Sequence, residues 1–269
     1  MKHIARKPPP PSLPDYRYLF DHIPRTGGSY LASVLCELLG PTSENIDCGP
    51  DYPHTHPAEM ERLDDFTVIV GHMRLDTVRA FNLIRPRRLI SVVRDPVSQI
   101  LSTYNFWRYN VTADLPHCNL AKTLSFSDFI RVPELRMTLD NPFTRHFFGL
   151  WEFDRLEQSD TSRILAVRMS ESYSFLGVTE RMDETVLAIS ALFETKPGFR
   201  MPKRPDYNAS KGKTQVADRD REFLIQLNAM DYEIYRHANE RLDRILRSNS
   251  VNSQSVSCEE GLSNCISLR

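Results

Sequence analysis

The chain has 269 residues, 41% of them hydrophobic and 26% charged, with a formal net charge of −1 at pH 7. The length suits one large α/β domain, or at most two small ones, and the composition is ordinary for a soluble globular protein. The balanced charge excludes a basic field of the kind that attracts nucleic acid, and no stretch approaches the ~20 apolar residues of a membrane span. An anion-binding site in this chain must therefore be built locally.

The two ends of the chain differ in composition from the rest. Residues 1–14 are basic and then proline-rich, without the apolar segment of a secretory signal, and residues 248–269 are rich in serine and asparagine. We therefore expect a flexible leader over 1–14, a single folded domain over 15–247 and a disordered tail over 248–269. The five cysteines lack CxxC spacing, which favours reduced thiols without metal. These features indicate a cytoplasmic, bacterial protein, unless a Golgi signal anchor has been removed.

Short apolar runs alternate with segments of helical periodicity along the folded part. The runs predict strands over Tyr16–Ile23, Phe66–Val70, Leu89–Val93 and Ile164–Val167. The periodic segments predict helices from Tyr30 to Leu39, from Pro96, over Met182–Phe193, and over Asp218–Leu246 with a bend near Asn228–Asp231. Alternation of this kind predicts an α/β fold, with a P-loop-like parallel β-sheet and helices on both of its faces.

A glycine-rich turn connects the first predicted strand to the first predicted helix. Gly27 and Gly28 allow the backbone to approach a phosphate, and the free N–H groups at Ser29 and Tyr30 begin the helix, whose dipole favours an anion. Thr26 and Ser29 add hydroxyl donors, and Arg25 adds a fixed cation. The loop is not a Walker A sequence, since it lacks the lysine that follows the second glycine. The alternative is a tight turn without a ligand.

A second basic element follows the strand Leu89–Val93. Arg94 stands where that strand ends, at the edge where open α/β sheets bind ligands, and Ser102 lies about two turns along the next helix. An arginine and a serine can hold one more phosphate. The alternative is that Arg94 forms an ion pair with Asp95 or another surface acid.

As a set, these elements resemble the sulfotransferase superfamily. Residues 23–29 (IPRTGGS) are similar to the 5′-phosphosulfate loop IPKTGGT, and residues 94–104 are similar to the 3′-phosphate motif RDPxxRxLSxY. Three shorter segments agree with the family patterns GH, FxGxTER and NALDxxLY: 71–72, 175–181 and 228–235. Within the superfamily the chain most resembles the group of heparan sulfate 2-O- and 6-O-sulfotransferases and their bacterial relatives.

The resemblance implies in-line transfer of a sulfuryl group from 3′-phosphoadenosine 5′-phosphosulfate (PAPS) to an acceptor hydroxyl, without a metal ion. Arg25, Thr26, Gly27, Gly28, Ser29, Tyr30, Arg94 and Ser102 would bind the donor. Lys211 and Lys213 lie where the family has a late loop that closes over the nucleotide. Arg25 replaces the usual lysine, and Ser98-Gln99 replaces a more basic stretch. Because arginine keeps its proton near neutral pH, Arg25 would neutralise the leaving phosphate without donating a proton to it.

His72 is the candidate catalytic base, because it directly follows a buried strand and lies at the same sheet edge as the loop. An isolated histidine is more often held by a backbone carbonyl, but its position and the GH resemblance favour catalysis. His22, just before the loop, is assigned to packing or loop support.

The subgroup resemblance implies a carbohydrate acceptor, in a glycan or a glycolipid. Tyrosyl peptides and small hydroxylated metabolites remain alternatives. So do two other classes of protein: an atypical P-loop nucleotide kinase or NTPase, and a non-catalytic module that binds PAPS or its bisphosphate product.

Overall fold

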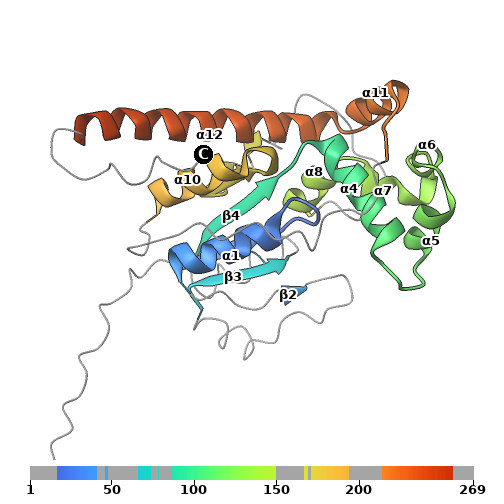
Figure 1. Cartoon of the computed structure of the whole chain (residues 1–269), viewed down its shortest axis with the longest axis horizontal. Helices are drawn as coiled ribbons and strands as arrows, with labels where there is room; N and C mark the ends of the chain where they lie inside the picture. The colour runs from blue at the N-terminus through green and yellow to red at the C-terminus, as the bar shows by residue number, and fades with distance from the viewer. Residues whose placement is uncertain are drawn as a thin grey trace, which may run out of the picture.

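The structure is a computed structural model of the whole chain, and it describes residues 17–40, 46–47, 66–73, 78, 86–149, 167–168, 171–193 and 214–256. Its centre is a five-stranded sheet in the order β2-β3-β1-β4-β5, with every strand pair parallel (Figure 1). The strands are β1 (Tyr18–Asp21), β2 (Ile46–Asp47), β3 (Val68–His72), β4 (Arg88–Val93) and β5 (Phe175–Val178).

Among the described residues, helices follow β1, β4 and β5. In chain order the described ones are α1 (Gly28–Leu39), α4 (Pro96–Tyr109), α5 (Pro116–Thr123), α6 (Phe126–Phe129), η1 (Pro133–Leu135), α7 (Arg136–Leu139), α8 (Pro142–Phe148), η2 (Thr179–Arg181), α10 (Met182–Leu192), α11 (Asp218–Leu227) and α12 (Ala229–Val256). Among the described residues, no helix combines the length and the hydropathy needed to cross a bilayer.

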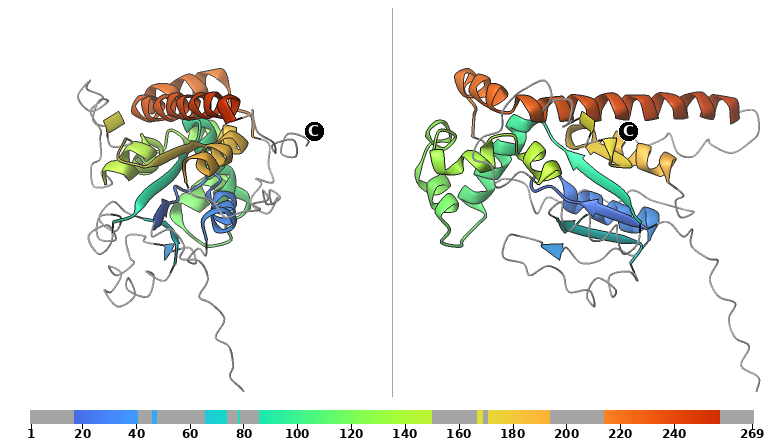
Figure 2. Two further views of the ribbon diagram at one scale, coloured as in Figure 1. Left: turned by 90° about the vertical axis from the view of Figure 1, so that its left-hand side faces the viewer. Right: turned by 180° about the vertical axis from the view of Figure 1, so that it is seen from behind.

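Both faces of the sheet carry helices, because successive side chains of a strand point to opposite faces. On one face, Tyr18 contacts the ring of Phe193 at the end of α10. On the other face, Asp21 contacts His146 of α8. Figure 2 shows α1 and α8 on opposite sides of the strands, and α12 runs along the molecule at the β5 edge. The predicted α/β fold, with a parallel sheet flanked by helices, is confirmed.

A second apolar cluster lies at one end of the molecule (Figure 1). It joins the buried face of α4, through Val97, Ile100 and Tyr104, to α5, α6 and Leu224 of α11. Arg108 donates to the carbonyl groups of Ala121 and Leu124. Helix α4 is therefore anchored on the side away from the sheet, so that its other side can face the loops at the sheet edge.

The structure differs from the sequence predictions at two elements. The sequence predicts a strand over Ile164–Val167, but Val167 is helical and residues 164–166 lie outside the described part. Periodicity alone does not distinguish so short an apolar run from a piece of helix. The fifth strand is Phe175–Val178 instead.

The second difference concerns the C-terminal helices. The predicted bend is present as a break at Asn228, which separates α11 from α12. Helix α12 then continues to Val256, beyond the predicted end of the folded part at Arg247.

Candidate functional site

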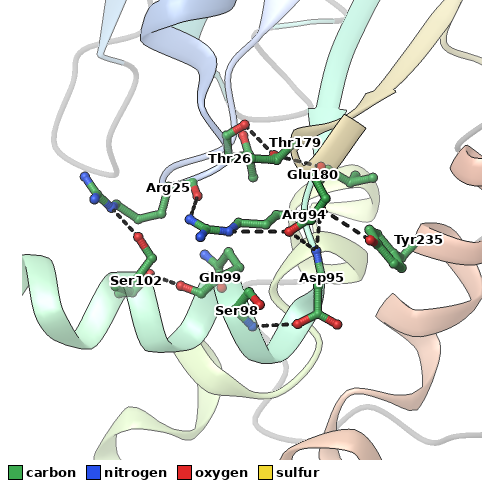
Figure 3. Close-up of polar contacts among 12 residues, drawn as sticks. Arg25, Thr26, Arg94, Asp95, Ser98, Gln99, Ser102, Thr179, Glu180 and Tyr235 are labelled. Carbon is green, nitrogen blue, oxygen red and sulfur yellow. Dashed lines mark hydrogen bonds and ion pairs between the residues drawn. The ribbon is translucent and has the colours of Figure 1, made fainter. Parts of the chain in front are cut away.

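Three loops meet at the carboxyl edge of the sheet, after the neighbouring strands β1, β4 and β5 (Figure 3). The first is the glycine loop that leads into α1. The second is Arg94-Asp95, which leads into α4, and the third is the 3₁₀ turn η2. Since ligands of parallel α/β sheets bind outside the carboxyl ends of the strands, this edge is the candidate site.

The two glycines of the first loop are required for different reasons. Gly27 has a φ of 79°, in the left-handed region that favours glycine, and its peptide precedes the first turn of α1. Gly28 lies against the imidazole of His22, so that an added Cβ would stand 2.5 Å from the Cγ atom of that ring and nearer still to Cδ2 and Nε2. No side chain caps the helix at Gly27. The N–H groups of the first turn therefore suit an anion.

The Thr26 hydroxyl, which was predicted to donate to a ligand, donates within the loop instead. The Thr26 side chain is fully buried, and its Oγ1 donates to the carbonyl oxygen of Ile23 at 2.7 Å. That hydroxyl thus stabilises the turn, because its single hydrogen is already used. Ser29 is half-buried, while Tyr30 packs in the main core.

Arg25 extends from the loop towards α4. Its φ is 66°, unusual for a residue with a side chain, and its Nε donates to Ser102 Oγ at 3.2 Å. The guanidinium carbon lies 4.4 Å from the centre of the Phe106 ring, a cation–π contact. Burial, and then the neighbouring Arg94 cation, lower the pKa of Arg25. The Arg25 side chain is thus held against α4 by Ser102 and Phe106.

Arg94 connects the second loop to the first. Its Nη1 donates to the carbonyl oxygen of Arg25 at 3.1 Å, and its Nε lies 3.7 Å from Glu180 Oε1. Burial lowers the pKa of Arg94, and the carboxylates of Glu180 and Asp95 act in the opposite direction. The Asp95 carboxylate itself caps α4 by accepting from the Ser98 N–H at 2.8 Å. Arg94 therefore forms its ion pair with Glu180, which lies in the turn after β5, and not with the adjacent Asp95.

The η2 turn holds the other two loops together, and sequence reasoning assigned it no role. Thr179 Oγ1 lies 2.6 Å from the carbonyl oxygen of Thr26 and 3.0 Å from that of Val93. The Glu180 carboxylate accepts from the backbone N–H of Asp95 at 3.3 Å. The family pattern FxGxTER covers both residues, so this resemblance was the available signal.

His72 lies at the carboxyl end of β3, next to the glycine loop, as predicted. Its Nδ1 is 2.5 Å from the carbonyl oxygen of His22, so Nδ1 carries the hydrogen and Nε2 keeps its lone pair in the neutral ring. The two imidazole rings are 4.4 Å apart. Burial, followed by the nearby His72, His146 and Arg25, lowers the pKa of His22 to about 3. His22 therefore stays neutral beside the candidate base.

A buried polar cluster lies beneath the loop, and nothing in the sequence pattern indicated it. The carboxylate of Asp21 is 2.8 Å from His146 Nε2 and accepts from the Tyr173 hydroxyl at 2.6 Å. Burial and the Asp21 charge raise the pKa of Tyr173. Because Asp21 directly precedes His22, this cluster fixes the end of β1 from which the loop begins.

Two predicted donor-binding residues, Lys211 and Lys213, lie outside the described residues. The residue that follows them, Thr214, donates its hydroxyl to Asn105 Oδ1 of α4 at 2.8 Å. Within the described part of the chain, no three side chains of the metal-ligating types gather as a metal site would require.

The chain is similar in sequence to known sulfotransferases. Residues 13–238 match the sequence model of the sulfotransferase family. A protein-tyrosine sulfotransferase of Arabidopsis thaliana is 29% identical over 134 residues, which are 48% of this chain and 25% of that protein. The chain thus spans about a quarter of this curated relative. The crystal structure of mouse sulfotransferase SULT7A1 complexed with PAP aligns over 79% of this chain and 83% of its own, with 13% identity and a TM-score of 0.35.

Proposed function

Because the chain belongs to the sulfotransferase family, we propose that it transfers the sulfuryl group of PAPS to a hydroxyl group of an acceptor. The observation that carries the proposal is the direct contact between two anion-binding loops, in which Arg94 Nη1 donates to the carbonyl oxygen of Arg25. One loop offers the uncapped start of a helix, and the other offers an arginine with a buried serine. A donor with a phosphate on each side of its ribose matches such a pair of sites.

In this proposal the 5′-phosphosulfate binds at the start of α1, to the backbone N–H groups of Gly28, Ser29 and Tyr30. The 3′-phosphate binds near Arg94 and Ser102. Lys211 and Lys213 complete the donor site from the segment that precedes Thr214, whose hydrogen bond to Asn105 supports this placement. No step requires a metal ion, because arginine and lysine side chains and helix N–H groups supply the positive charge.

His72 acts as the base in this scheme. Its Nε2 takes the proton of the acceptor hydroxyl while that oxygen bonds to sulfur and the bond between sulfur and the phosphate oxygen breaks. The products are the sulfated acceptor and adenosine 3′,5′-bisphosphate. The hydrogen bond from Nδ1 to the His22 carbonyl supports this role, since it holds the ring in the tautomer that has a free Nε2.

For the acceptor we propose a carbohydrate hydroxyl, on the basis of the motif resemblance. The similarity to the Arabidopsis protein-tyrosine sulfotransferase favours a second acceptor class, tyrosine in a peptide. A transfer screen with labelled PAPS over sugars, glycolipids, tyrosyl peptides and phenols distinguishes the two classes. Label on the peptides alone would refute the carbohydrate proposal.

The donor proposal is tested by thermal unfolding of the wild type and Arg94→Ala with adenosine 3′,5′-bisphosphate or ATP. A ligand at 100 times its Kd adds about 2.7 kcal/mol, or roughly 5–10 °C in Tm for a chain of this size. We expect that shift for the wild type with the bisphosphate, and a much smaller shift for Arg94→Ala. The exposed Arg236, which pairs with Glu233 and Glu240, provides the control variant Arg236→Ala. Equal shifts with ATP would instead favour a kinase or NTPase.

The base assignment is tested by His72→Ala. We expect this variant to bind the bisphosphate as the wild type does, while its transfer rate falls by about 10²- to 10⁴-fold. Transfer at the wild-type rate would refute His72 as the base. Bisphosphate binding by the wild type without transfer to any acceptor would favour a non-catalytic module.

A further inference from the structure

Four polar side chains of α12 form one row that faces the loops of the candidate site. They are spaced three, four and four residues apart, so they share one face of the helix. The row consists of Tyr232, Tyr235, Asn239 and Asp243. Its first two members contact the acidic groups beside Arg94, and its last two contact Arg181 of η2.

The Arg181 contacts attach α12 to the η2 turn. Asp243 Oδ1 lies 2.7 Å from Arg181 Nη2, and Asn239 Oδ1 accepts from Arg181 Nη1 at 3.3 Å. Arg181 also forms an ion pair with Glu184 of α10. These contacts hold the backbone of η2, and they involve Arg181 rather than Arg94. They therefore provide a structural attachment with which the two tyrosine contacts can be compared.

The tyrosine contacts lead to the surroundings of Arg94 instead. The Tyr232 hydroxyl donates to Asp95 Oδ2 at 3.0 Å. The Tyr235 hydroxyl donates to Glu180 Oε2 at 3.3 Å (Figure 3). The Glu180 carboxylate also accepts from the backbone N–H of Asp95 at 3.3 Å. Two donors, one from α12 and one from the loop before α4, thus hold this carboxylate.

Held in this way, Glu180 stops short of a hydrogen bond to Arg94. Its Oε1 lies 3.7 Å from Arg94 Nε, which is close enough for an ion pair and too far for a hydrogen bond. Among the described residues this Nε atom has no hydrogen-bond partner, although it is buried. A carboxylate that came closer would form the paired hydrogen bonds that arginine favours, and it would then compete with an anionic ligand. The position of Glu180 thus decides how much of the guanidinium a ligand can use.

Because Tyr235 is one of the two groups that set this position, we infer that it is a positioning residue for donor binding. Its hydroxyl holds the Glu180 carboxylate back, so that Arg94 stays available to the donor, and it couples the attachment of α12 to the donor site. The inference rests on the function proposed above. Burial, and then the Glu180 charge, raise the pKa of Tyr235 to about 12, so the hydroxyl keeps its hydrogen near neutral pH.

Tyr235→Phe tests this role, because it removes the hydroxyl and keeps the ring. We would measure by calorimetry the binding of adenosine 3′,5′-bisphosphate to the wild type, Tyr235→Phe, Glu180→Gln and the double variant. We expect Tyr235→Phe to weaken binding by about 5- to 30-fold, because Glu180 then pairs with Arg94. In the Glu180→Gln background, where no carboxylate competes, the same change should alter the affinity by less than about twofold. A general loss of structure would instead lower the affinity in both backgrounds.

Asp243→Asn is the matched control on the same face of α12. It weakens the Arg181 attachment, so it should lower the Tm while the bisphosphate affinity stays within about twofold of the wild type. Hydrogen exchange gives a second measurement, because coupling between two sites is reciprocal. The bisphosphate should slow exchange of the α12 amides by on the order of fivefold in the wild type, and by less in Tyr235→Phe.

The possible results separate the inference from the proposed function. Wild-type affinity in Tyr235→Phe, or an equal loss in both Glu180 backgrounds, would overturn the inference and leave the proposed function intact. An Asp243→Asn protein that loses as much affinity as Tyr235→Phe would do the same. A wild type that does not bind the bisphosphate would overturn the proposed function and the inference with it.

Discussion

Replacement of Gly28 by alanine tests how closely the glycine loop and the candidate base are coupled. The new Cβ would stand 2.5 Å from Cγ of His22, whereas carbon atoms in contact are separated by about 3.5–4.0 Å. The imidazole would therefore have to move by roughly 1 Å or more. It has little room to do so, because it is buried and stands 4.4 Å from the ring of His72 and 5.7 Å from that of Phe20.

We expect the free energy of unfolding of Gly28→Ala to fall by about 1–3 kcal/mol, which is the usual cost of overpacking. That corresponds to a decrease in Tm of roughly 2–12 °C for a protein of this size. The transfer rate should fall further, by on the order of 10²-fold, because displacement of His22 also displaces the carbonyl group that orients His72.

Differential scanning calorimetry and a labelled PAPS transfer assay measure the two effects. Ser29→Ala, at the next position of the same helix turn, is the control and should leave the Tm nearly unchanged. The double variant His22→Ala/Gly28→Ala should be more stable than the sum of the single changes implies, because the smaller side chain leaves space for the new Cβ. A Gly28→Ala protein with the Tm and the transfer rate of the wild type would refute the steric coupling.

Two further predictions concern groups away from the reacting atoms. Burial raises the pKa of Asp231 to about 7 although it accepts hydrogen bonds from Phe143 and Thr144. The stability that its proton confers is therefore present below the ordinary carboxyl pKa and is lost as the pH rises through about 7. Urea unfolding at pH 5 and pH 8 should show a loss of about 2–3 kcal/mol relative to Asp231→Asn, and parallel pH profiles would contradict this. Thr179→Val, which removes the hydroxyl near the Thr26 and Val93 carbonyls, should lower the free energy of unfolding by about 1–2 kcal/mol and weaken bisphosphate binding. Unchanged bisphosphate affinity in a destabilised Thr179→Val protein would show that η2 supports the fold without supporting the site.

The strands β3 and β4 and the start of α1 could be predicted from the sequence alone. Continuous apolar runs predicted β3 and β4, and the double glycine marked the start of α1. The position of His72 followed from its place after a strand, since all parallel strands deliver their carboxyl ends to one edge. Each of these predictions depends on neighbours within about ten residues in the chain.

The contacts at the candidate site that the sequence did not predict are long-range. Asp21 meets His146 and Tyr173 across 125 and 152 residues, and no local pattern specifies such partners. Arg25 and Thr26 carry groups suited to a phosphate, but their directions depend on Ser102 and on the turn at Ile23. Residue types therefore indicated which polar groups the loop carries, whereas the tertiary structure determined the contacts that each side chain makes.

The reciprocal capping of α8 and α12 has a consequence for the order of assembly. Asn141 Oδ1 accepts from the Asp231 N–H at the start of α12, while the Asp231 carboxylate accepts from the N–H groups of Phe143 and Thr144 in α8. The start of each helix is thus satisfied only when the other is present. During synthesis the glycine loop leaves the ribosome early, whereas α12 leaves it late. The start of α8, and therefore the surroundings of His146, are complete only when α12 is present. A nascent chain that stops before α12 would carry the glycine loop without this support, so the proposed donor binding should be acquired only near the end of translation.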